Sequence, residues 1–325
     1  MKIRELRKEL EKHDNKELKD IIVYIYKLLP KRKLEDYDVD EYLTKKKEID
    51  KKKKENIDEP ISIEDLKVKV HNFIVTVDYG YYANPNKIIS KTQRSNWRFT
   101  VKRFYKELNS INPNSEDGIW ATDALIKLFK RLSLGTYILR FPNWNTFEAL
   151  GVLQSNYYDN IINRVCSKSY SRENLKKCID LLSVYKSSSE LSINMYNVFL
   201  SYLKTTDIRE ITIGLLKEKI ENLNEYAKKI KDSTDLYYLN ENINYMVYLI
   251  TSIYFKLCET DKGIKFFHKN YNERDKEVKE YQLLNIIEEF EDYKTWVKEY
   301  ESKELDYRDS LKEKYIKYKE LINER

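Results

Sequence analysis

Glycine and proline are scarce in this chain, with 6 Gly and 5 Pro among 325 residues. Parallel α/β folds and β-sandwiches depend on these two residues to turn the chain, so their scarcity favours long helices joined by short polar loops. The chain is also highly charged, with 35% Asp, Glu, Lys and Arg against 41% hydrophobic residues. This balance is typical of an elongated helical array, which exposes much helix surface for the size of its core.

Apolar residues recur every three or four positions along most of the chain, which is the spacing of one face of an α-helix. Two short segments of this kind open the sequence, and Asp14 with Glu17 between them matches a capping box. We therefore expect an N-terminal helical hairpin. After Ser62 the same spacing favours a helix, although the β-branched residues from Val68 to Val77 leave a strand open.

From Thr146 onward the sequence predicts one helix after another, joined by short loops that supply capping residues. Thr206 or Asp207 is expected to cap one of these helices and Ser233 to open the next, while Gly135 and Gly263 are expected to mark helix ends. No fixed repeat period is visible. The predicted fold class is therefore all-α: an irregular, α-solenoid-like array of stacked antiparallel helices that follows the N-terminal hairpin.

Composition divides the chain into three expected parts. Residues 1–58 hold the hairpin and a charged linker or helix, residues 59–150 a basic, aromatic helical subdomain, and residues 151–325 a helical array with an acidic end. Lys45–Lys54 carries seven Lys and two acidic residues. Such a run favours a solvated helix extension or a charged linker, with an electrostatic arm for phosphate as the alternative. Asn56–Pro60 resembles a domain boundary.

The cysteines and the lengths of the apolar runs indicate the cellular compartment of the protein. Cys166, Cys178 and Cys258 are widely spaced and lie in helical apolar patterns, which predicts buried thiols in a reducing compartment. The charged N-terminus does not resemble a secretory signal. No apolar run approaches the roughly 18 residues that a membrane-spanning helix needs. We therefore expect a cytoplasmic protein without a membrane partner.

The sequence offers little for catalysis or for metal binding. His13, His71 and His268 are isolated from one another and from other ligand types, so no metal site is predicted. The few glycines exclude a P-loop and a dinucleotide-binding fingerprint, and no cofactor is expected. We nominate no catalytic residue and favour a non-enzymatic protein, although a catalytic site built from distant residues stays open.

The stretch Tyr79–Lys106 stands out because it contains seven Lys or Arg residues and no acidic residue. Trp97, Phe104 and neighbouring apolar residues predict one helix face within it, which we interpret as core. Basic residues recur every fourth position beside that face, where their mutual repulsion calls for an anionic partner. The candidate binding residues of this stretch are Tyr81, Tyr82, Asn86, Arg94, Arg98, Lys102, Arg103 and Lys106.

Two explanations of the basic stretch compete. Its charges pair inside the molecule with the tail 270–325, which has 12 basic and 16 acidic residues, or they bind an outside partner. The preferred function is a cytosolic interaction scaffold that binds another protein or a second copy of itself through a helical groove and the basic patch. The alternative is a nucleic-acid-binding protein that uses the same stretch.

Overall fold

The computed structural model describes residues 3–30, 62–83, 86–143, 145–184 and 194–323, together with Leu34, Asp40 and Leu43. All regular secondary structure in these residues is helical, and none of them lies in a strand. The predicted all-α fold class is therefore confirmed. The chain divides into two compact units, Met1–Ser62 and Ile63–Arg325. The three-part division predicted from composition stays a prediction.

The first unit begins with α1 (Ile3–Leu10) and α2 (Asn15–Leu28). The predicted capping box is present: the Asp14 carboxylate accepts hydrogen bonds from the amides of Lys16 and Glu17, and the Glu17 carboxylate accepts one from the Asp14 amide. No residue of α2 is buried among the described residues. The charged run Lys45–Lys54 and the boundary Asn56–Pro60 lie outside the described residues.

The second unit is a succession of helices. They are α5 (Ile63–Asp78), the 3-10 turn η1 (Arg94–Asn96), α6 (Trp97–Ser110), α7 (Glu116–Gly135), α8 (Thr146–Leu150), α9 (Gln154–Val165), α10 (Arg172–Leu181), α11 (Asn194–Tyr202), α12 (Thr206–Ala227), α13 (Ser233–Lys256), α14 (Thr260–Asn270), α15 (Lys276–Phe290), α16 (Tyr293–Glu301) and α17 (Asp309–Asn323). The helix α5 decides the open question over Val68–Val77 in favour of helix.

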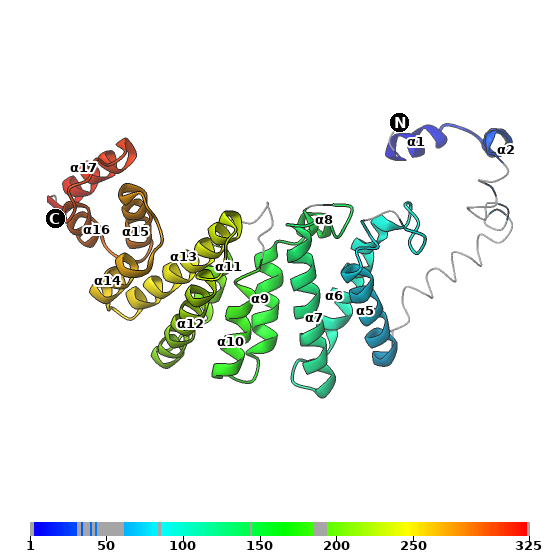
Figure 1. The fold of residues 1–325 in the computed structure, drawn as a ribbon. Helices are drawn as coiled ribbons and strands as arrows, with labels where there is room; N and C mark the ends of the chain where they lie inside the picture. The colour runs from blue at the N-terminus through cyan, green and yellow to red at the C-terminus, as the bar shows by residue number, and fades with distance from the viewer. Residues whose placement is uncertain are drawn as a thin grey trace. The chain divides into compact units, whose positions relative to one another are not determined.

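These helices pack mainly on their neighbours in the chain. Within the second unit they follow one another in a row from α5 to α17 (Figure 1). The principal contacts, such as α7 with α9, α10 with α12 and α13 with α14, join helices no more than two places apart in that order. Each helix therefore buries its apolar face against nearby helices, as the predicted array requires.

The two glycines expected at helix ends differ in outcome: Gly135 is the last residue of α7, whereas Gly263 lies inside α14. A Cβ added to Gly135, in the last turn of α7, would sit 2.8 Å from the Phe141 ring. A Cβ added to Gly263, inside α14, would sit 2.7 Å from the Phe255 ring of α13. Both positions lack room for a side chain. The expected helix end at Gly135 is confirmed, and the expected helix end at Gly263 is wrong.

The break between α13 and α14 lies at Cys258, whose φ of 58° is left-handed. This cysteine is exposed, so the prediction that it is a buried thiol is wrong, whereas Cys166 and Cys178 are buried as expected. Ser115 caps α7 and Ser171 caps α10, each through its side-chain hydroxyl. Ser233 opens α13 as expected, with Asp232 before it as the cap, whereas the cap of α12 is Thr205, one residue before Thr206. Within the described part of the chain, no helix combines the length and apolar character required to traverse a bilayer.

Candidate functional site

The packing of the apolar face of α6 determines which face of this helix is directed outward. Val101 and Leu108 are fully buried, and the Trp97 ring, also fully buried, lies 4.3 Å from that of Phe141 between centroids. Phe104 meets Phe73 of α5 edge to face at 5.7 Å. The core face predicted from sequence is confirmed, and the opposite side of α6 must therefore face solvent.

Three predicted cations occupy that outward side. Lys102, Arg103 and Lys106 are exposed, and none of them forms an ion pair with any residue that the structure describes. Phe99 projects between them with 58% of its surface exposed. We call Phe99, Lys102, Arg103 and Lys106 the α6 basic face. Phe99 was not a sequence candidate, although its position opposite the buried residues is a signal that the helical spacing contains.

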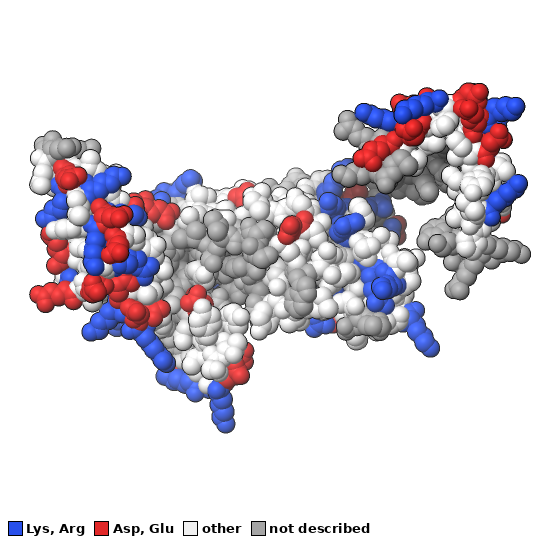
Figure 2. Space-filling model, turned by 90° about the horizontal axis from the view of Figure 1, so that it is seen from above, with Lys and Arg blue, Asp and Glu red and all other residues white. Residues whose placement is uncertain are grey.

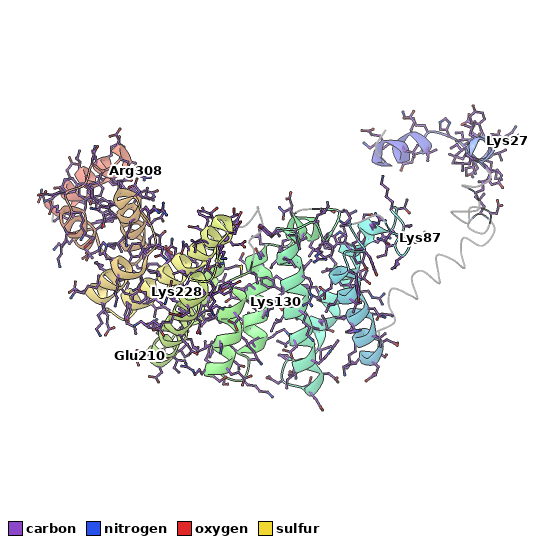
Figure 3. All side chains as sticks on the ribbon, in the orientation of Figure 1. Lys27, Lys87, Lys130, Glu210, Lys228 and Arg308 are labelled. Atoms are coloured by element: carbon purple, nitrogen blue, oxygen red, sulfur yellow. The ribbon has the colours of Figure 1, made fainter. Side chains whose placement is uncertain are left out.

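The acidic tail does not neutralise the α6 basic face. Several acidic side chains of the tail pair with bases of the tail itself, such as Glu277 with Arg308 and Glu288 with Lys314, each at 2.6 Å. Figure 2 shows blue and red side chains interleaved over α14–α17, and Figure 3 labels Arg308 in this region. Internal pairing with these described residues therefore does not explain the basic residues of α6.

Arg94 and Arg98 are placed differently from the other predicted cations. Both are half-buried, and Arg94 Nε donates a hydrogen bond to the carbonyl of Ile89 at 3.1 Å. The guanidinium carbon of Arg98 lies 4.9 Å from the Phe99 ring centroid, and its Nε is buried without a hydrogen-bond partner among the described residues. Arg94 therefore holds the turn before α6, Arg98 packs on Phe99, and both contribute less accessible charge than the α6 basic face.

The predicted tyrosines are half-buried side chains that pack on other rings. Tyr82 contacts Phe73 at 5.4 Å and Phe141 at 6.2 Å between ring centroids, and burial raises the pKa of its phenol. Tyr81 stacks on Tyr79 at 5.4 Å. Tyr82 is thus part of the packing between α5 and the connection after α7, and it does not lie beside the α6 basic face as an open stacking platform.

Asn86 organises the turn that leads from α5 to η1. Its side-chain amide donates to the carbonyl of Tyr81 at 2.8 Å, and its side-chain oxygen accepts from the amides of Ile88 and Ile89 at 2.9 and 2.8 Å. Lys87 is exposed on the same turn (Figure 3). Asn84 and Pro85, which precede Asn86 in the sequence, lie outside the described residues.

A cavity of about 620 Å³ lies between the end of α7 and the helices α12 and α13. Tyrosine dominates its lining, and two carboxylates, Asp235 and Glu241, contribute negative charge. Burial raises the pKa of Glu241. Its volume is in the range of ligand pockets in other proteins, and aromatic faces with carboxylates suit a cationic or amphipathic side chain. The tyrosines that line it are Tyr137, Tyr226, Tyr237, Tyr238 and Tyr245.

A buried cluster of polar side chains is a further feature, and the sequence did not indicate it. His268 of α14, Glu280 of α15 and Glu299 of α16 place one potential ligand atom each within 4.8 Å of one another. His268 Nε2 lies 2.9 Å from Glu299 Oε1. Glu280 is only 2% exposed and Glu299 only 8%. We call these three residues the His–Glu cluster.

The pKa values of the two carboxyl groups in the His–Glu cluster are shifted in opposite directions. Burial, and then the negative charge of Glu299, raise the pKa of Glu280 to about 8. Burial also opposes ionisation of Glu299, but its hydrogen bond with His268 and the charge of that imidazole hold its pKa below the ordinary value. Glu280 is therefore protonated and Glu299 ionised at neutral pH.

No protein-family model matches this chain, and no curated protein or solved structure is significantly similar to it. The geometry of its own residues is therefore the basis for a functional proposal.

Proposed function

We propose that this protein is a non-enzymatic interaction scaffold of the cytosol that binds an acidic segment of another protein through the α6 basic face. The observation that carries the proposal is the exposure of Lys102, Arg103 and Lys106 without an ion pair among the described residues. Lys102 and Lys106 lie one turn apart, where like charges repel by about 0.2–0.5 kcal/mol. An anionic partner removes this repulsion on binding.

Two further features support the proposal. The tyrosine-lined cavity offers a concave surface of the same unit, suited to a side chain of the bound partner. All three cysteines carry free thiols, which supports a reducing compartment such as the cytosol. The pairing of tail acids with tail bases favours a different protein as partner over a second copy of this chain, because it leaves fewer free carboxylates for the α6 basic face.

A titration with a fluorescent, Glu-rich peptide of about 20 residues tests the proposal. We expect binding whose affinity falls as salt rises, because exposed charges are screened within about 10 Å at 0.1 M salt. The triple variant Lys102→Glu, Arg103→Glu, Lys106→Glu should weaken it at least tenfold, read by fluorescence anisotropy. These residues are preferred over Arg94 and Arg98 because they are exposed and hold no local structure.

A matched control separates the α6 basic face from net charge. Lys204→Glu, Lys265→Glu and Lys276→Glu make the same change of charge at exposed positions away from α6. This control should retain the affinity of the unmodified protein within about twofold. Equal loss in both triple variants, or retained binding in the α6 variant, would contradict the proposal.

Nucleic acid is the second candidate partner, and the exposure of Phe99 among three cations favours it. An aromatic ring at such a position can stack on an unpaired base, for about 1–3 kcal/mol per base. A single-stranded oligonucleotide in the same titration distinguishes the two. Tighter binding to the oligonucleotide, weakened by Phe99→Ala and with a steep salt dependence, would favour nucleic acid over an acidic protein.

A further inference from the structure

The His–Glu cluster joins three successive helices through polar side chains in the interior. His268 comes from α14, Glu280 from α15 and Glu299 from α16, so no short sequence motif contains the three. Buried ionisable groups are normally paired or bound to a metal, because leaving them without partners carries a large desolvation penalty. The hydrogen bond between His268 and Glu299 satisfies only part of this cluster.

Glu280 supplies the unsatisfied group. Its Oε1 atom is buried and has no hydrogen-bond partner among the residues that the structure describes, and the residue is 2% exposed. The nearest basic residue in sequence, Lys279, directs its ammonium group elsewhere, to the carbonyl oxygens of His268 and Tyr271 at 2.8 Å each. Glu280 also shares a hydrogen bond with Glu299, so this oxygen lies beside a second carboxylate and the imidazole of His268.

We propose that His268, Glu280 and Glu299 bind a divalent transition-metal ion of the zinc type. One imidazole nitrogen and two carboxylate oxygens are donors that Zn²⁺ uses at about 2.0–2.2 Å. Tetrahedral coordination at that length separates ligand atoms by about 3.4 Å, and the potential ligand atoms already lie within 4.8 Å of one another. Binding displaces the proton of Glu280, and the two ionised carboxylates then balance the charge of the ion. Mg²⁺ and Ca²⁺ prefer all-oxygen sites, so the imidazole selects against them.

The surroundings leave the ion an open coordination position, and one of the proposed ligands lines a cavity. A cavity of about 400 Å³ is lined by residues of α14 and α16, including Glu299. Three protein ligands leave at least one coordination position for water or another group. The competing charge is Lys303, whose Nζ lies 4.0 Å from Glu299 Oε1, and its side chain is 40% exposed and free to turn toward solvent. Bound metal would then fix α14, α15 and α16 to one another.

Calorimetric titration of the chelator-treated protein with Zn²⁺ alone tests this site. We expect one equivalent to bind and the midpoint of thermal unfolding to rise, because an ion that binds only the folded state stabilises it. Glu280→Gln and His268→Gln should each weaken binding at least tenfold while circular dichroism shows unchanged helix content. His71→Gln and Glu320→Gln change the same residue types at exposed positions and should leave the affinity unchanged.

A second measurement needs no variant. Co²⁺ bound by imidazole and carboxylate ligands should give visible absorption that saturates at one equivalent and disappears when Zn²⁺ is added. Absence of Zn²⁺ binding to the unmodified protein would overturn the proposal. Equal binding by the unmodified protein, Glu280→Gln and His268→Gln would also overturn it, because the ion would then lie elsewhere. Binding of Mg²⁺ as tightly as Zn²⁺ would contradict the assigned donor set.

Discussion

At the scale of a single residue, the carboxyl group of Glu280 makes the stability of the folded protein depend on pH. Its pKa is raised from 4.5 to about 8 in the folded protein, chiefly by burial. The groups around it are Glu299, His268, Lys303 and Lys279, with Tyr307 also within electrostatic range. Between these pH values the folded state keeps a proton that the unfolded state has released.

We therefore predict that metal-free protein loses stability as pH rises from about 4.5 to about 8. In this window the folded state binds more protons than the unfolded state, so the free energy of unfolding falls with pH. The loss should exceed about 1.4 kcal/mol, the equivalent of one pKa unit. Urea unfolding at several pH values measures it. Glu280→Gln should flatten this profile, and an unchanged profile in that variant would contradict the assignment.

The sequence predicted the positions of some residues of the candidate sites better than those of others. The exposure of Lys102 and Lys106 followed from helical spacing. Arg94 and Arg98 share their four-residue spacing, but each such step drifts by about 40° around the helix, so the first members of the stripe turn toward the core. His268 and its two carboxylate neighbours lie on different helices, and no local pattern signals that they meet.

At the scale of helices, the glycines of α12 and α14 make a matched pair. Gly263 of α14 faces the ring of Phe255 of α13, and an added Cβ would lie 2.7 Å from it. Gly214 lies inside α12 with no atom within 4 Å of its added Cβ. Replacement of glycine by alanine would therefore crowd the Phe255 ring at position 263, whereas the added methyl group has open space at position 214.

We predict that Gly263→Ala destabilises the protein by about 1–3 kcal/mol through overpacking of α13 against α14. Gly214→Ala should instead stabilise it by about 0.5–1 kcal/mol, because Ala has the higher helix propensity. Chemical denaturation of the two variants and the unmodified protein gives both values. Stabilisation by Gly263→Ala, or equal effects of the two changes, would show that the close contact between α13 and α14 is not present.

Helix existence was predictable, whereas several helix ends were not. Periodic apolar residues located α6 and α7 because their faces are buried with regular spacing. Thr205, Thr206 and Asp207 are all residues that cap helices, so local chemistry could not choose among them, and the backbone places the cap at Thr205. The expected helix end at Gly263 is wrong because the close contact with Phe255 that requires a glycine there comes from the tertiary fold.

At the scale of the whole molecule, the second unit is an all-helical succession whose principal contacts join near neighbours. Low glycine and proline content and high charge predicted this class because they disfavour compact α/β and β architectures. Such arrays present extended surfaces on consecutive helices. The α6 basic face and the tyrosine-lined cavity are two surfaces of this kind, and the proposed scaffold function depends on their reaching a partner.

Affinity purification from cells of the source organism tests the scaffold proposal most directly. The unmodified protein, the α6 triple variant and the control triple variant are compared after nuclease treatment, and the recovered proteins are quantified by mass spectrometry. The account predicts one stoichiometric partner with an acidic segment, recovered with the unmodified and control proteins and lost with the α6 variant. The same partners in all three samples, or a signal that nuclease abolishes, would contradict it.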